Sequence, residues 1–164
     1  MKSLVTSLDP LDVRLLALLQ EDATRTHARL SEDVPLSPSQ IQRRVRRLEE
    51  QGAIARTVAL LDAERLGLGV VAFTSVMLER HGERVAEDFH AGVRRLPEVQ
   101  ECHAVSGEAD YLLRIVAPDL RSFSDFLMHR LMPLRGVANV KSNIVLETVK
   151  TTSALPLDHL AGKG

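Results

Sequence analysis

The sequence predicts a two-domain α+β protein, a winged helix-turn-helix domain followed by a ferredoxin-like βαββαβ domain. Apolar residues recur with a helical period over the first sixty residues, and strand-like and helix-like segments alternate after them. The chain has 164 residues, 45% of them hydrophobic, which suffices for one ordinary domain or two small ones. We place the domains at residues 1–62 and 63–150, followed by a C-terminal tail at 151–164.

Two helices are expected in the first forty residues. Asp9 can cap the first helix and Pro10 can open it, and the helix should end near Asp22. Its apolar face is formed by Leu11, Leu15, Leu18 and Leu19. A short second helix is expected over residues 26–34, because Pro35 disfavours helix in the residue before it.

The third helix has the clearest local signals. Ser37 stands at the N-cap, Pro38 at the first helical position and Gln40 where a capping box needs it, while Gly52 supplies the stop. Its inward stripe is Ile41, Val45 and Leu48. The outward face or its borders then carry Ser39, Gln40, Gln42, Arg43, Arg44, Arg46 and Arg47.

A strand-like run over residues 54–60 follows the third helix and would act as the wing, leaving Arg56 available as a flanking phosphate contact. The second domain is expected to begin near the turn at residues 64–67. Its strands are expected at residues 70–79, 99–105, 111–117 and 137–148, and its helices at 83–96 and 120–134.

Several function classes are disfavoured by composition. Five aromatic residues and no Trp are few for stacking on single-stranded bases. Cys102 is the single cysteine, the six histidines lack the short spacings of a zinc site, and neither a phosphate loop nor a nucleophile elbow is present. The apolar stretch from Leu66 to Leu78 is too short to span a membrane. We therefore expect a cytoplasmic protein without metal, cofactor or catalytic residues.

The net charge of −1 does not indicate a nucleic-acid partner, but four arginines and no acid lie between Ile41 and Leu48. A helix with Ser, Gln and Arg outside suits the major groove, where Gln can bind adenine and Arg can bind guanine. The alternative is a solvated helix face balanced by Glu49 and Glu50. The capped position as third helix favours DNA binding.

The chain resembles the Lrp/AsnC (leucine-responsive, feast/famine) family of transcriptional regulators over nearly its whole length. The matching stretches are Leu8-Asp9 with Asp12, Leu36-Ser37-Pro38, Arg44 to Glu49 with Gly52-Ala53-Ile54, Pro97 to Cys102, Ser106 to Leu113, and Gly136-Val137 leading to Ser142. Ser31 and Pro35 depart from the alanine and glycine usual in the family.

For DNA, the resemblance implies that Ser37 begins the recognition helix. Residues approaching bases or phosphates would be Ser39, Gln40, Gln42, Arg43 and Arg44, while Arg46, Arg47 and Arg56 would hold the DNA backbone. Paired recognition helices of a homodimer, assembled further into a tetramer or octamer, would bind double-stranded DNA.

For the effector, the resemblance implies an amino acid, hydrophobic or branched, bound at a subunit contact and linked to amino-acid metabolism. The implied residues are Ser106, Gly107, Glu108, Ala109, Asp110, Tyr111, Ser142 and Asn143. Gly107 would permit the turn and Asp110 would bind the ammonium group. Without the resemblance, Gly107 to Asp110 reads simply as a hairpin turn.

Two alternative functions share this architecture. One is an enzyme similar to siroheme decarboxylases, which would leave the arginine-rich helix without an evident task. The other is an amino-acid-sensing oligomer that acts on protein partners without binding DNA.

Overall fold

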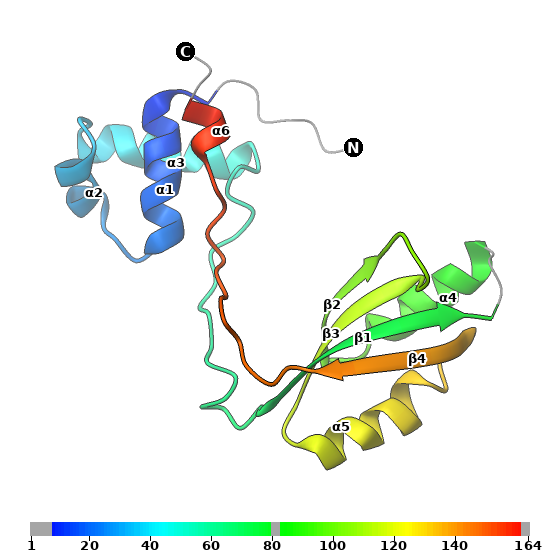
Figure 1. The fold of residues 1–164 in the computed structure, drawn as a ribbon. Helices are drawn as coiled ribbons and strands as arrows, with labels where there is room; N and C mark the ends of the chain where they lie inside the picture. Colours follow the sequence, from blue (N-terminus) through cyan, green and yellow to red (C-terminus); the bar gives the residue numbers. More distant parts are fainter. Residues whose placement is uncertain (1–7, 80–82, 162–164) are drawn as a thin grey trace. The chain divides into compact units, whose positions relative to one another are not determined.

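The computed structural model describes residues 8–79 and 83–161, which divide into two compact units (Figure 1). Unit 1 combines the chain up to Leu60 with the segment from Lys150 onward, and unit 2 is Leu61–Val149. The segment after Lys150, expected as a separate tail, therefore belongs to the same unit as the N-terminal helices. In the described ranges no helix is long and apolar enough to cross a membrane.

Unit 1 is helical, and side-chain caps fix where its helices begin. Its elements are α1 (Pro10–Glu21), α2 (His27–Asp33), α3 (Pro38–Glu50) and the short α6 (Asp158–Ala161). Asp9 and Asp12 form a capping box on α1, as Ser37 and Gln40 do on α3, and Thr26 caps α2. The caps predicted on Asp9 and Ser37 are thereby confirmed.

The core of unit 1 lies where the three N-terminal helices meet. Leu15, Leu18, Leu30, Val34 and Ile41 form one buried cluster. The helix-turn-helix pair is thus held by apolar side chains from both of its helices, α2 and α3. Pro35 does not disturb this packing because it lies exposed in the turn between them.

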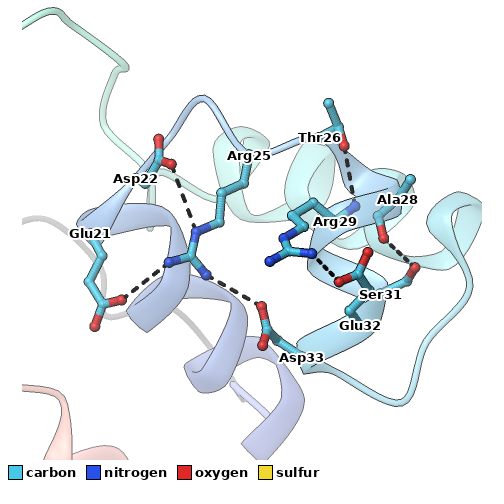
Figure 2. A network of polar contacts seen from close by, with 9 residues as sticks. All are labelled: Glu21, Asp22, Arg25, Thr26, Ala28, Arg29, Ser31, Glu32 and Asp33. Carbon is cyan, nitrogen blue, oxygen red and sulfur yellow. Dashed lines mark hydrogen bonds and ion pairs between the residues drawn. The ribbon is translucent and has the colours of Figure 1, made fainter.

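A surface network ties α2 to the end of α1 (Figure 2). The guanidinium of Arg25 lies 3.4 Å from Asp33, 3.7 Å from Glu21 and 3.9 Å from Asp22. Ser31, which departs from the alanine that the resemblance implies, donates its hydroxyl to the carbonyl of Ala28, 2.6 Å away on its own helix. The serine is accommodated within α2.

The expected wing strand is not formed. Residues 54–60 have no strand conformation, and Val58 and Leu60 are 57% and 76% exposed. A strand needs a partner for its backbone groups, and the described part of unit 1 contains no strand that could pair with it. Only the turn after α3 is fixed, by Ala53 and Ile54 donating to the carbonyl of Leu48.

The C-terminal segment is anchored on α1. The side-chain amide of Gln20 donates to the carbonyl of Leu155 at 3.0 Å and accepts from its N–H at 2.9 Å. Beyond this clamp, α6 lies against α1. The amide of Gln20 thus pairs with the backbone of Leu155 as a neighbouring strand would.

Unit 2 is a four-stranded antiparallel sheet with the order β2-β3-β1-β4. In chain order its elements are β1 (Val70–Leu78), α4 (Glu83–Val93), β2 (Val99–Ala104), β3 (Tyr111–Ala117), α5 (Leu120–Phe126) and β4 (Val137–Ile144). This order and connectivity are those of the predicted ferredoxin-like βαββαβ domain.

The two faces of the sheet differ sharply. On one face, alternate residues of β1 and β3, among them Val76 and Leu113, pack with Phe89 of α4 and Phe123 of α5 in a single core. The other face carries Phe73 and Met77, which are 40% and 41% exposed. Both helices therefore cover the same side, and the opposite side is open in one subunit.

The helix predicted over residues 120–134 changes geometry midway. After Phe126 it continues as a π-helical turn (Leu127–Leu131), in which Met132 donates to the carbonyl of Leu127 at 2.9 Å. The wider turn brings Phe126 and Leu131, five positions apart, to the same buried core. In an α-helix these two side chains would diverge.

Candidate functional site

The outward face of α3 carries a polar stripe. Ser39, Arg43 and Arg46 follow each other at i, i+4 and i+7 and are exposed, opposite the fully buried Ile41 and Leu48. Arg46 also forms an exposed 2.9 Å ion pair with Glu50, a weak contact in water. The stripe can therefore meet a ligand that lies along the helix.

The remaining polar residues at the start of α3 have mixed roles. Gln42 is exposed beside the stripe. Gln40 uses its Oε1 atom to accept from the N–H of Ser37 at 2.8 Å, and Ser37 in turn accepts from the N–H of Gln40. Ser37 and Gln40 thus define the helix start, and Arg56 lies exposed in the irregular segment beyond α3.

Two of the four arginines turn toward α1 instead. Asp12 is 1% exposed, and its Oδ1 accepts from Nη1 of Arg44 at 2.8 Å while its Oδ2 accepts from Nη2 of Arg47 at 2.5 Å. Arg44 Nη1 also donates to Asp9 at 2.5 Å. Arg44, expected among the base- and phosphate-approaching residues, is held by two carboxylates of its own unit.

The charges of this cluster stabilise one another. Partial burial alone would raise the pKa of Asp9, but hydrogen bonds from the Arg44 guanidinium and the Asp12 N–H lower it on balance. The hydrogen bond to Asp9, followed by the one to Asp12, raises the pKa of Arg44.

Asp9 and Asp12 were expected only to open α1. Their three-residue spacing matches that of Arg44 and Arg47, a signal usable only once α1 and α3 are known to cross.

The loop between β2 and β3 is a hairpin turn fixed by Asp110. The Asp110 N–H donates to the carbonyl of Val76 at 3.0 Å, and its Oδ2 accepts from the N–H of Leu78 at 2.8 Å. Gly107 has a φ of 130°, a backbone conformation that other residues rarely adopt. Ser106, Gly107 and Glu108 are exposed, whereas Ala109 and Asp110 are half-buried.

The other predicted effector residues point in different directions. Tyr111 is 7% exposed, and its hydroxyl lies 2.9 Å from Nε2 of His90 on the helix-covered side. Burial raises the pKa of this hydroxyl. Ser142 lies 2.9 Å from Thr74 on the same side, whereas Asn143 lies on the open face opposite Phe73. One subunit does not gather these residues on a single surface.

A hollow in unit 2 lies elsewhere. It is lined by Glu98, Ser122, Asp125, Phe126, His129 and Arg130. None of the predicted effector residues, all of which the structure describes, lines it. Within residues 8–79 and 83–161, no group of three or more His, Cys, Asp or Glu side chains is arranged to hold a metal ion.

Both units match known family models. Residues 8–49 match the AsnC-type helix-turn-helix domain, and residues 71–155 match the Lrp/AsnC ligand binding domain. The first match covers α1, α2 and α3 as far as Glu49, and the second covers the sheet from Val71 onward and the chain as far as Leu155.

Curated and solved relatives cover almost the whole chain. The leucine-responsive regulatory proteins of Salmonella typhimurium and Escherichia coli K12 are 40% and 39% identical over 148 residues, 90% of this chain and of each relative. A Neisseria meningitidis transcriptional regulator, solved as a complex with L-Met, is 42% identical with a TM-score of 0.91 over 94% of this chain and 99% of that chain. An AsnC family regulator from Agrobacterium tumefaciens is 37% identical, with a TM-score of 0.88 over 93% and 99%. The chain therefore belongs to the Lrp/AsnC family of helix-turn-helix transcriptional regulators.

Proposed function

We propose that this regulator reads double-stranded DNA with α3 and responds to an amino acid bound by unit 2. The observation that carries the first part is the two-sided character of α3. Its apolar side is docked on α1 and α2, while Ser39, Arg43 and Arg46 form an exposed stripe on the other side. A capped helix with this stripe fits the major groove, where Arg binds guanine and phosphates and Ser binds base edges or phosphates.

We assign the residues of α3 separate roles. Ser39, Gln42 and Arg43 approach base edges, and Arg46 holds the phosphate backbone, because the recognition helix of this fold contacts bases from its N-terminal half. Arg56 contacts the flanking backbone from the segment after α3. Ser37 and Gln40 set the position at which the helix begins.

The effector is an amino acid. Solved relatives support this, because the Neisseria regulator and a feast or famine regulatory protein from M. tuberculosis, 28% identical, were each solved with L-methionine. In this chain, the loop from Ser106 to Tyr111 supplies exposed backbone and the Asp110 carboxylate. Because Ser142 and Asn143 lie on opposite faces of β4, the site takes its remaining groups from another subunit.

The functional form is a homodimer that assembles into a tetramer or octamer in the cytoplasm. The open face of the sheet supports self-association, since Phe73 and Met77 expose apolar surface there beside the Glu101–Arg114 ion pair. Two recognition helices of a dimer would contact half-sites about 34–36 Å apart.

A selection of random-sequence DNA by the purified protein, followed by footprinting, tests the DNA-binding part. The expected product is a pseudo-palindrome with two protected half-sites about one helical turn apart. Failure to enrich any sequence at physiological salt would contradict it. A thermal-shift panel of the twenty amino acids, run with light scattering, tests the effector part. We expect a selective shift together with a change in assembly size.

A further inference from the structure

Asp12 lies at the centre of a four-residue charge cluster that joins α1 to α3. Its carboxylate is buried, and it accepts hydrogen bonds from Arg44, Arg47 and the N–H of Asp9. With Asp9, the cluster contains two acids and two guanidiniums. A buried carboxylate is tolerated only with such partners, so Asp12 fixes where both arginines lie.

The two arginines are held to different degrees. The Arg44 side chain is 21% exposed, and its Nη1 atom contacts both Asp9 and Asp12. The Arg47 side chain is 44% exposed and reaches Asp12 through Nη2. A guanidinium has five N–H donors, so Arg47 retains exposed donors while one edge of it is clamped.

Helical spacing places these arginines beside the outward stripe. Arg47 follows Arg43 by four residues and Arg46 by one, so it borders the stripe on the side of α1. Arg44 lies one further step around the helix, toward the buried residues. Arg47 is therefore at the edge of the surface that meets DNA, and Arg44 is behind it.

We propose that Asp12 is a positioning residue for DNA recognition, which holds Arg47 in place for one phosphate and withholds Arg44 from DNA. The inference rests on the proposed use of α3 as the DNA-reading helix. A clamped Arg47 contacts a phosphate at one fixed place relative to Arg43, so it supports the register of base reading. Loose arginines would bind phosphates on any sequence and favour specific and non-specific DNA alike.

The test compares the salt dependence of binding for single variants of the two arginines. The probes are the duplex selected from the random pool and a scrambled duplex of the same composition. Each phosphate contact contributes about 0.9 to the slope of log affinity against log salt, which is about a 3.5-fold change between 50 and 200 mM. Arg47→Gln should lower the slope by about 0.9, the contribution of one phosphate contact. Arg44→Gln should leave the slope unchanged. Equal slopes for the two variants would overturn the inference.

Asp12→Asn tests the positioning role directly. It keeps the shape of the side chain, takes the Asp12 carboxylate from Arg47 and leaves Arg44 paired with Asp9 alone. We expect tighter binding to the scrambled duplex, a steeper salt slope and a smaller ratio between selected and scrambled affinities. A merely structural role predicts that affinity for both duplexes falls together, and that result would overturn the proposal.

Two further variants make the outcome specific. Asp12→Asn combined with Arg44→Gln removes the cation that Asp9 alone would then hold, so it should return the affinity for scrambled DNA and the slope toward wild type. Thermal unfolding by circular dichroism checks folding, and the Arg44 and Arg47 singles test the proposal even if Asp12→Asn does not fold. The second variant, Arg43→Gln, tests the use of α3 itself. If it leaves the affinity for the selected duplex unchanged, α3 is not the reading helix. If Arg43→Gln weakens binding while Asp12→Asn preserves discrimination, only the role of Asp12 fails.

Discussion

Replacing Asp110 separates its two roles, because asparagine can keep one of them while alanine keeps neither. In the structure the carboxylate accepts from the N–H of Leu78 at 2.8 Å, which fixes the hairpin against the end of β1. In the proposed function the same carboxylate binds the ammonium group of the effector. Asp110→Asn retains an oxygen acceptor for Leu78 and removes the charge that an ammonium group needs.

The expected magnitudes differ for stability and for effector binding. A hydrogen bond to a charged group contributes about 1.5–3 kcal/mol and a neutral one about 0.5–1.5 kcal/mol. Asp110→Ala should thus lower the free energy of unfolding of unit 2 by about 1.5–3 kcal/mol, and Asp110→Asn by about 1 kcal/mol. Loss of the charge-assisted contact to the ammonium group should weaken effector binding about 10- to 150-fold in both variants.

The assay is calorimetric titration with L-methionine, or with whichever amino acid gives the largest thermal shift, alongside urea unfolding. Glu108→Gln is the matched control, because it removes an exposed carboxylate from the same loop and should change effector affinity less than threefold. Affinity for the selected duplex without effector should be retained in all three variants. Wild-type effector affinity in a folded Asp110→Asn protein would refute the ammonium-binding role.

Four further predictions follow from the structure. An added Cβ at Gly136 (φ 87°) would lie 2.4 Å from Val85, whereas at Gly67 (φ 80°) it meets nothing within 4 Å. In urea titrations Gly67→Ala should lower the free energy of unfolding by about 1–2 kcal/mol, from backbone strain alone. Gly136→Ala should lower it by about 2–4 kcal/mol, because the clash with Val85 adds to the strain, and equal losses in the two variants would contradict this clash. Gln20→Ala removes both hydrogen bonds to Leu155, so hydrogen exchange at the Leu155 amide should speed up while α1 keeps its protection. The lowered pKa of Asp9 stabilises unit 1 at neutral pH, and this contribution should disappear as the pH falls through that lowered pKa. Asp9→Asn should flatten this acid limb of the stability profile. Added siroheme should show no change in its Soret absorbance when it is mixed with the protein. A change would instead favour the tetrapyrrole enzyme.

Local chemistry explains why so much of the fold could be predicted. The starts of α1 and α3 were predicted because Asp9-Pro10 and Ser37-Pro38 carry their caps in adjacent residues. The strand Tyr111–Ala117 was predicted with the bounds that the structure shows. The prediction of a wing strand was wrong because the β-branched residues at 57 and 58 indicate only a preference for strand conformation. Strand pairing also needs a second strand, which the described residues of unit 1 do not supply.

The arginines of α3 show where helical periodicity stops being informative. The inward stripe of Ile41, Val45 and Leu48 divides α3 into an apolar and a polar side, and that division was predicted correctly. It does not distinguish Arg43 from Arg44, because both lie outside the stripe. What separates them is the position of Asp12, which depends on how α1 packs across α3. Packing between helices far apart in the sequence is not encoded in the spacing within either one.

For the predicted effector residues of β4, strand periodicity alone restricts which face of the sheet each side chain can occupy. Ser142 and Asn143 are consecutive on β4, so they must point to opposite faces, and the register with Thr74 and Phe73 places them there. Both can line one amino-acid site only if that site joins surfaces of two subunits. Such a site exists only in the assembly, so effector binding and assembly must favour each other to the same extent. The apparent affinity for the amino acid should then rise with protein concentration, and a concentration-independent affinity would place the site within one subunit and remove Ser142 or Asn143 from it.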